Sequence, residues 1–204
     1  MNKLKHALWL ASLAVLFSAC AAQKPVSRAG YTLHGSIAGA TDSTWVYILN
    51  QDKFNSAPLS DSTQIRKGKF ILTGTVPNEA MLVFVGIKGP VYAADGKNVQ
   101  RYRLTDAAPV WLENKVIPFD GTKGSLYKTS GNIAQDYFRN NQAADDAAFI
   151  QRNPDEYFSA YVLNVRKETW SRDQVAELYT LLSQKVKDSL YGRQLAEFLA
   201  LSDQ

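Results

Sequence analysis

The chain has 204 residues, a formal net charge of +4, one cysteine and two histidines. Its lysines and arginines are scattered, so they do not form the basic stripe by which proteins bind nucleic acid. So few thiols and imidazoles leave little room for a zinc site, and the chain has no Walker loop, G-x-G-x-x-G or G-x-S-x-G motif. We therefore predict no catalytic, metal-binding or cofactor-binding residues and expect a protein that is not an enzyme.

The N-terminus has the three zones of a secretory signal peptide. A basic start at Lys3 and Lys5 precedes an apolar run over residues 7–17, and small residues then lead to Cys20. The apolar run is shorter than the roughly 20 residues that a membrane-spanning helix needs. We therefore predict a signal peptide over residues 1–19.

The residues before Cys20 resemble the lipobox of bacterial lipoproteins, in which the cysteine becomes the lipidated N-terminal residue. The stretch reads Leu16-Phe17-Ser18-Ala19-Cys20, with phenylalanine where leucine is usual. The alternative is an ordinary signal peptide with a chance cysteine. Lipidation of Cys20 would anchor the chain to a membrane by its acyl chains, since each buried methylene contributes about 0.8 kcal/mol. Small and polar residues 20–30 then form a lipidated tether, and the lack of an acidic pair after the cysteine favours the periplasmic face.

Residues 31–130 carry short runs of β-branched and aromatic residues separated by turn residues. The run over residues 81–87 is the most apolar, which predicts a central strand. A turn is expected at Lys67-Gly68, and another at Asp95-Gly96. This spacing predicts an antiparallel β-sandwich or open barrel. The expected strands are residues 31–37, 44–49, 61–65, 69–76, 81–87, 101–104, 110–112 and 115–119.

Near residue 131 the apolar period changes from 2 to 3.6 residues, which predicts a helical segment over residues 131–204. Asn153 and Pro154 are placed as the N-cap and first residue of one helix. Ser171 opens a capping box with Gln174, and Gly192 is expected to interrupt the last helix. The whole chain is therefore predicted to be α+β, with a β-domain followed by helices.

Several of these stretches together resemble the β-domain family DUF4369. The resemblance lies in residues 31–37, 45–48 and 66–77, and it extends to the helical residues 153–163 and 186–192. In Bacteroidetes lipoproteins such a domain precedes a thioredoxin-like domain of the TlpA or AhpC/TSA type. The resemblance therefore implies a cell-envelope lipoprotein with a β-sandwich-like domain.

The sequence departs from those relatives in one respect that bears on function. It stops at Gln204, where they continue into a thioredoxin fold, so their catalytic residues have no counterparts here. We expect a membrane-anchored, periplasm-facing accessory or binding module, whose partner is a separate thioredoxin-like protein in the narrowest version. The alternatives are a carboxylate-dependent hydrolase of envelope or glycan substrates and a purely structural envelope protein.

Some side chains suit a binding or catalytic role, but each also has a structural interpretation. Five aromatic residues would suit a platform for glycan or peptide, although their spacing favours the core or an interface: Trp45, Trp111, Trp170, Tyr92 and Tyr102. His34 is interpreted as a half-exposed strand residue, and the adjacent Asp145 and Asp146 as a solvated helix face. Five acids near loops lack the spacing of a calcium-binding loop, so turn chemistry is favoured: Asp52, Asp61, Asp95, Asp106 and Asp120.

Overall fold

The computed structural model describes residues 30–50, 52–55, 59–92, 99–140 and 146–201, and the side chains of residues 89–103 are not part of that description. The predicted signal peptide and the tether with Cys20 therefore lie outside the described residues, except for Gly30. In the described part of the chain, no helix combines the length and apolarity needed to cross a membrane.

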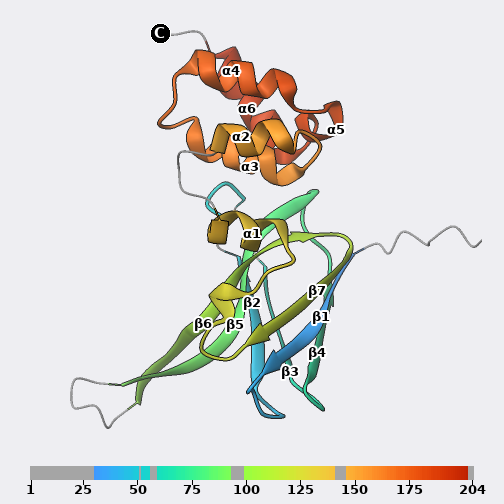
Figure 1. Cartoon of the computed structure of the whole chain (residues 1–204), viewed down its shortest axis with the longest axis vertical. Coiled ribbons are helices and arrows are strands. Elements are labelled where there is room, and N and C mark those ends of the chain that lie inside the picture. The colour runs from blue at the N-terminus through green and yellow to red at the C-terminus, as the bar shows by residue number, and fades with distance from the viewer. Residues whose placement is uncertain (1–29, 51, 56–58, 93–98, 141–145, 202–204) are drawn as a thin grey trace, which may run out of the picture.

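Two β-sheets pack against each other as a sandwich (Figure 1). The three-stranded sheet has the order β4 (Lys69–Gly74), β1 (Tyr31–Ala38), β7 (Val116–Thr122). The four-stranded sheet has the order β3 (Ser60–Gln64), β2 (Trp45–Asn50), β5 (Ala80–Tyr92), β6 (Val99–Glu113). The sheets do not close into a barrel, which confirms the sandwich form of the predicted α+β fold.

One strand pair departs from the predicted antiparallel pattern, because β7 runs parallel to β1. The chain leaves β6 and enters the three-stranded sheet at the end where β1 begins, and Thr32 N donates to Lys115 O over 3.0 Å. Between the sheets, Phe70 and Phe119 flank Gly35 with their ring centroids 5.9 Å apart. A Cβ at Gly35 would lie 1.6 Å from Phe119 O, so this position needs glycine.

The hairpin of β5 and β6 is longer than the sequence predicted. Residues 101–104 and 110–112 were expected to be separate strands, yet β6 runs through both. Pro109 lies inside it, which is tolerated because β6 is an edge strand. The strand β2 pairs only with residues 83–87 of β5, so residues 88–92 of β5 and their partners on β6 extend past the sandwich as a two-stranded ribbon (Figure 1).

Helices gather at one end of the sandwich (Figure 1). A short 3-10 turn, η1, precedes them. A second apolar core lies between the helices and the outer face of β5 and β6, where Ala80, Leu82 and Trp111 contribute from the strands. The helical elements are η1 (Leu126–Lys128), α1 (Ile133–Asn140), α2 (Asp146–Arg152), α3 (Tyr157–Arg166), α4 (Arg172–Leu181), α5 (Gln184–Lys187) and α6 (Leu190–Ala200).

The helix boundaries confirm one prediction and correct two. Ser171 caps α4, because its hydroxyl oxygen accepts from Gln174 N over 3.3 Å. Asn153 instead ends α2, where its side chain donates to Phe149 O over 2.8 Å, and α3 begins only after a turn. Gly192 lies within α6 rather than interrupting it. A Cβ there would lie 2.3 Å from Val186 O, so glycine allows α5 and α6 to approach closely.

Candidate functional site

The aromatic residues singled out from the sequence do not form one platform. Trp111 is 1% exposed and packs at 5.0 Å between ring centroids against Phe158 under the helices. Trp170 is half-buried beside the helical core. Trp45 is 46% exposed on β2, where its ring lies 6.3 Å from that of Tyr47. The backbone of Tyr92 and Tyr102 belongs to the ribbon, and their side chains lie outside the description.

Four of the five acids accept hydrogen bonds from backbone N–H groups, but the turn interpretation fits only Asp52, because Asp61, Asp106 and Asp120 lie within β3, β6 and β7. Asp52 accepts from Phe54 N over 2.9 Å, and Asp61 accepts from Ser62 N over 2.7 Å. Asp106 accepts from Leu126 N and Asp120 from Ser36 N, over 2.9 and 3.0 Å. Asp95 lies outside the described residues. Within those residues, no three or more side chains of His, Cys, Asp and Glu are grouped to hold a metal ion.

The interpretation of Asp146 as a solvated residue was wrong, while Asp145 lies outside the described residues. Asp146 is fully buried at the start of α2. It forms an ion pair with Arg166 of α3 and accepts from the Tyr137 hydroxyl of α1 over 2.8 Å. The Asp146 carboxylate holds the pKa of the Arg166 guanidinium above its usual range. The three helices are thus joined through one carboxylate, a structural role.

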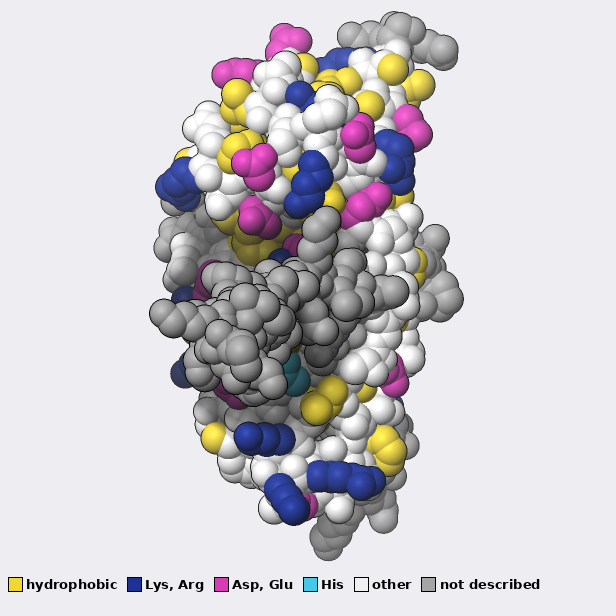
Figure 2. All heavy atoms as spheres, turned by 90° about the vertical axis from the view of Figure 1, so that its right-hand side faces the viewer, with side chains coloured by type: hydrophobic (Ala, Val, Ile, Leu, Met, Phe, Trp, Pro, Cys, Tyr) yellow, Lys and Arg dark blue, Asp and Glu magenta, His cyan; other side chains and the backbone are white. Residues whose placement is uncertain are grey.

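His34 lies on the outer face of the three-stranded sheet. It is exposed rather than half-exposed, and it stands between Ile71 of β4 and Pro118 of β7 in the strand register. Figure 2 is viewed from the side of the molecule on which the described histidine, in cyan, reaches the surface. Within the described residues, His34 belongs to no group of three or more His, Cys, Asp and Glu side chains that could hold a metal ion.

The turn between β3 and β4 opens into a groove at the side of the sandwich. Lys67 and Gly68 adopt φ of 51° and 73°, the left-handed pair typical of a tight hairpin turn. Arg66 and Lys69 exchange two backbone hydrogen bonds of 2.8 and 3.1 Å. Beyond this bridge the two strands separate, because β3 joins the four-stranded sheet and β4 the three-stranded sheet. The predicted turn is confirmed, and its strands diverge to form a groove.

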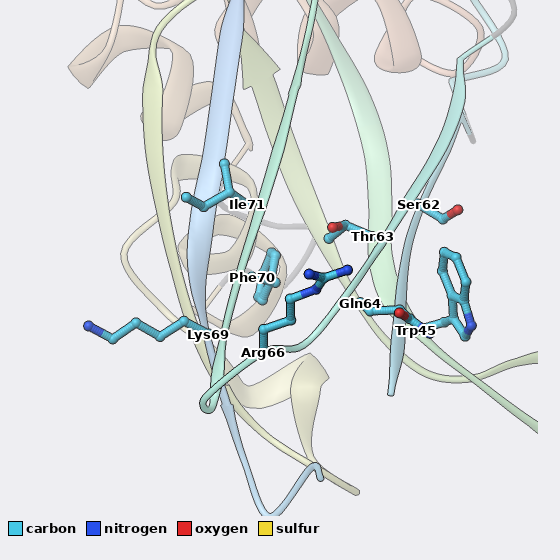
Figure 3. A pocket seen from close by; sticks show the side chains of 8 residues that line it. All are labelled: Trp45, Ser62, Thr63, Gln64, Arg66, Lys69, Phe70 and Ile71. Carbon is cyan, nitrogen blue, oxygen red and sulfur yellow. The ribbon is translucent and has the colours of Figure 1, made fainter. Parts of the chain in front are cut away.

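The groove between β3 and β4 has a volume of about 500 Å³, within the usual range of ligand pockets. In Figure 3 the guanidinium of Arg66 reaches between the strands beside Phe70, while Lys69 points away from the centre. Ile71 forms the rim on one side, with 61% of its surface exposed, and Trp45 forms the other. The remaining lining residues are Ser62, Thr63 and Gln64.

The charge at the turn end of the groove is positive. Arg66, Lys67 and Lys69 are all exposed there. The nearby acid Asp42 accepts from Lys67 N and Gly68 N over 2.9 and 3.1 Å, and these two bonds hold its pKa below the usual range. Figure 2 shows lysine and arginine side chains gathered at the end of the sandwich away from the helices.

A second hollow of about 490 Å³ lies between α1 and α2. Its walls include Tyr137 and Phe149, which also belong to the helical core. These two rings form part of the helical packing, whereas the groove between β3 and β4 combines open strand edges with exposed cationic side chains. The groove is therefore the better candidate site.

The sequence indicated part of this site. It predicted the turn at Lys67-Gly68 and pointed to Trp45, but it did not single out Arg66, Lys69 or Ile71. The sequence did contain a signal for Ile71. In the run Lys69-Phe70-Ile71-Leu72-Thr73, this apolar residue falls on the same side of the strand as the polar Lys69 and Thr73. Alternation of that kind assigns Phe70 and Leu72 to the core and leaves Ile71 on the exposed side.

Comparison with known proteins identifies the family but no closer relative. A family model described as a domain of unknown function, DUF4369, matches residues 31–138. No curated protein and no solved structure gives a significant match to the chain. The matched region includes all seven strands described here and ends within α1, a few residues beyond the boundary at 130 that the sequence suggested. Because the match covers more than half of the chain, the protein belongs to the DUF4369 family.

Proposed function

We propose that this protein is a lipid-anchored, non-enzymatic binding module of the bacterial cell envelope, facing the periplasm, which holds a partner in the groove between β3 and β4. The observation that carries this proposal is the groove itself. It is an open, positively charged hollow bordered by two strand edges of different sheets. Edges of that kind are surfaces on which proteins bind other chains.

The course of β1 fits an anchored molecule. The register places Tyr31 opposite Gly74 and Ser36 opposite Lys69, so the chain enters the sheet at the end far from the turn of the groove. Ten residues after Cys20 would reach at most about 35 Å from a membrane. Anchoring at Cys20 would therefore leave the positive turn pointing away from the attachment point, where a partner can approach.

Two narrower hypotheses differ in what they require of the site. Service to a separate thioredoxin-like protein follows from the family resemblance and fits any protein-binding groove. A hydrolase would need two carboxylates free to act on a substrate, commonly within about 5–10 Å of each other. The described acids Asp52, Asp61, Asp106 and Asp120 already accept hydrogen bonds from backbone N–H groups. This favours binding over hydrolysis.

The test is site-specific crosslinking in intact cells. A photoreactive phenylalanine analogue replaces Lys69 at the groove or, as a matched control, the exposed Glu177 on α4. Capture of the same protein from Lys69 but not from Glu177, followed by mass spectrometry, is the expected result. Equal capture from both positions, or none from Lys69, would contradict a binding groove.

Lipid anchoring is tested in the same cells. Wild-type protein should incorporate an alkyne-labelled fatty acid and sediment with membranes, and Cys20→Ala should lose both properties. If the Cys20→Ala protein still sediments with membranes and carries the label, the anchor is not at Cys20. The crosslinking experiment tests the groove independently of the anchor, because its variants keep Cys20.

A further inference from the structure

We propose that the partner enters the groove as an extended, acidic segment of protein, which adds as a strand to the free edge of β4. This inference rests on the proposed binding role of the groove and specifies the kind of ligand that it takes. It requires three properties of the structure: a backbone edge directed outward, the absence of protection on that edge, and charge complementarity.

Backbone hydrogen bonding shows which groups of β4 point outward. Thr32 N donates to Lys115 O, so the even-numbered residues of β1 bond to β7 and the odd-numbered ones to β4. Leu33 and Gly35 therefore bond to Leu72 and Phe70. The intervening N–H and C=O groups, those of Ile71 and Thr73, are directed away from β1. They face the side of the sandwich on which the groove lies.

Three of the four sheet edges carry a feature that blocks strand addition. On β6, the side chain of Asn132 bonds to both N and O of Trp111, over 2.8 and 3.0 Å, and Pro109 lies two residues before on the same edge. On β7, Pro118 occupies an outward position and has no N–H. On β3, the outward N–H of Ser62 donates to the Asp61 carboxylate and is therefore not free to bond to an added strand.

The β4 edge is different. Among the described residues, no side chain bonds to the outward N–H groups of Ile71 and Thr73, and Ile71 is 61% exposed. An apolar residue on an unprotected edge strand promotes unwanted aggregation with other chains. Such an edge is therefore expected to persist where the protein uses it to bind a specific partner. Main-chain hydrogen bonds would supply the affinity of an added strand, and alternate side chains its specificity.

Charge and register then define the segment. Lys69 and Ile71 point to the same outer face of the sheet, two residues apart. Arg66 is already the antiparallel bridge partner of Lys69, so an added antiparallel strand would pair with Ile71 and Thr73 and end beside the turn. It would place an apolar residue opposite Ile71, and acidic residues at its C-terminal end would meet the side chains of Lys69 and Arg66. The preferred segment therefore carries acids at its C-terminal end and an apolar residue shortly before them.

An acidic glycan is the competing ligand, and the structure favours the peptide. A sugar would use the aromatic pair Trp45 and Tyr47, of which only Trp45 reaches the rim of the groove. The Tyr47 ring lies outside the groove lining, and Lys88 Nζ already lies 4.0 Å from its centroid. The outward N–H and C=O groups of β4 suit a peptide backbone better than a sugar. Substitution of Tyr47, which does not line the groove, therefore separates the two ligands in the experiment.

The probe is a synthetic eight-residue peptide that alternates valine and threonine and ends in two glutamates, with a fluorescent label at its N-terminus. Binding to the purified chain without residues 1–20 is measured by anisotropy. Ile71→Pro should weaken binding about tenfold or more, because it removes outward hydrogen bonding while leaving the bonds to β1. Val116→Pro is the matched control at the outward start of β7, outside the groove lining, and should leave binding within about twofold.

A second pair of measurements keeps the test independent of how the proline variant folds. The same peptide with N-methyl groups on alternate backbone amides should fail to bind the wild-type protein. The peptide with lysine in place of glutamate should bind at least about tenfold more weakly. Equal binding of the methylated peptide, loss of binding with Val116→Pro alone, or binding of an acidic oligosaccharide that Tyr47→Ala abolishes would each overturn strand addition to β4.

The outcomes also separate this inference from the broader proposal. If Lys69 still crosslinks a specific partner in cells but the acidic peptide does not bind, the groove is a binding site and strand addition is wrong. If neither is observed, both proposals fail.

Discussion

The helix-covered end of the sandwich and its open side differ in whether the outward-facing strand residues are buried. At the covered end, Leu82 and Trp111 point outward from β5 and β6 into the helical core, while their neighbours Val110 and Leu112 point into the sandwich core. At the open side, β3 and β4 separate and leave Ile71 and Arg66 exposed. Both regions begin with the same alternation along a strand. Only the covered end contains the helices that bury the second face.

Polar groups follow the same division. At the covered end, Asp52 accepts from the Tyr191 hydroxyl, Glu79 accepts from Leu190 N over 3.0 Å, and Gln194 donates to Phe54 O over 3.0 Å. These bonds join the β-domain to α6. At the open side, cationic and backbone groups face solvent. The comparison indicates that the covered end contributes stability, while the open side leaves its cationic and backbone groups accessible.

The largest expected difference in the free energy of unfolding is between substitutions of two tryptophans. Trp111→Ala should lower the free energy of unfolding by about 3–5 kcal/mol, because it leaves a cavity between the sheet and the helices. Trp45→Ala at the open side should change it by less than about 0.5 kcal/mol. Urea unfolding followed by circular dichroism measures both. Similar losses for the two variants would mean that the two regions do not differ as described.

The next effect concerns ion pairs. Arg166→Gln leaves the Asp146 carboxylate without its cation and should cost about 2–3 kcal/mol, somewhat below the value for a fully buried pair because the Arg166 side chain is partly exposed. The matched control is Glu168→Gln, which breaks an exposed pair with Lys53 and should cost less than about 0.5 kcal/mol. Thermal unfolding of both variants measures the difference. An equal cost would argue against a structural role for Asp146.

A smaller effect is expected where α6 joins the β-domain. Tyr191→Phe removes the hydroxyl that donates to Asp52 and, over 3.2 Å, to Ala80 O. Leaving these buried acceptors with one donor fewer should cost about 1–2 kcal/mol. Tyr127→Phe, at an exposed position, should have no measurable effect in the same urea titration. No loss in Tyr191→Phe would show that the two parts associate by apolar contact alone.

The smallest effect is a pH dependence within the sandwich. Burial, together with the charge of Asp61, raises the pKa of Tyr31 from 10.0 to about 12. The folded state thus favours the neutral phenol, so its stabilisation is complete below pH 10 and is lost as the pH rises to about 12. Tyr31→Phe should make the fall in stability over that range less steep. An unchanged slope would show that Tyr31 titrates equally in the folded and unfolded states.

Local patterns predicted much of the fold. Alternation along residues 31–37 and 69–76 located β1 and β4, and the Lys67-Gly68 pair located the turn between β3 and β4. Ser171 marked the start of α4. These predictions succeeded because strand period, left-handed turn residues and N-caps depend on a few neighbouring residues.

Other features required contacts between distant residues. The burial of Asp146 depends on Arg166, twenty residues along the chain, and on the hydroxyl of Tyr137. The position of Gly192 within α6 depends on the approach of α5. An acidic residue at a helix start is usually solvated, and a glycine in a helix usually weakens it, so local rules assigned both residues to the wrong environment.

The sequence by itself determined the α+β order, the turn chemistry and the DUF4369 resemblance that the family match confirms. Only the tertiary structure decided that β3 and β4 join different sheets and that the groove opens between them. The physical reason is that a turn of two residues fixes the direction of the chain locally. The partner of each strand is selected by which apolar face it can bury, and that choice depends on β1 and β2.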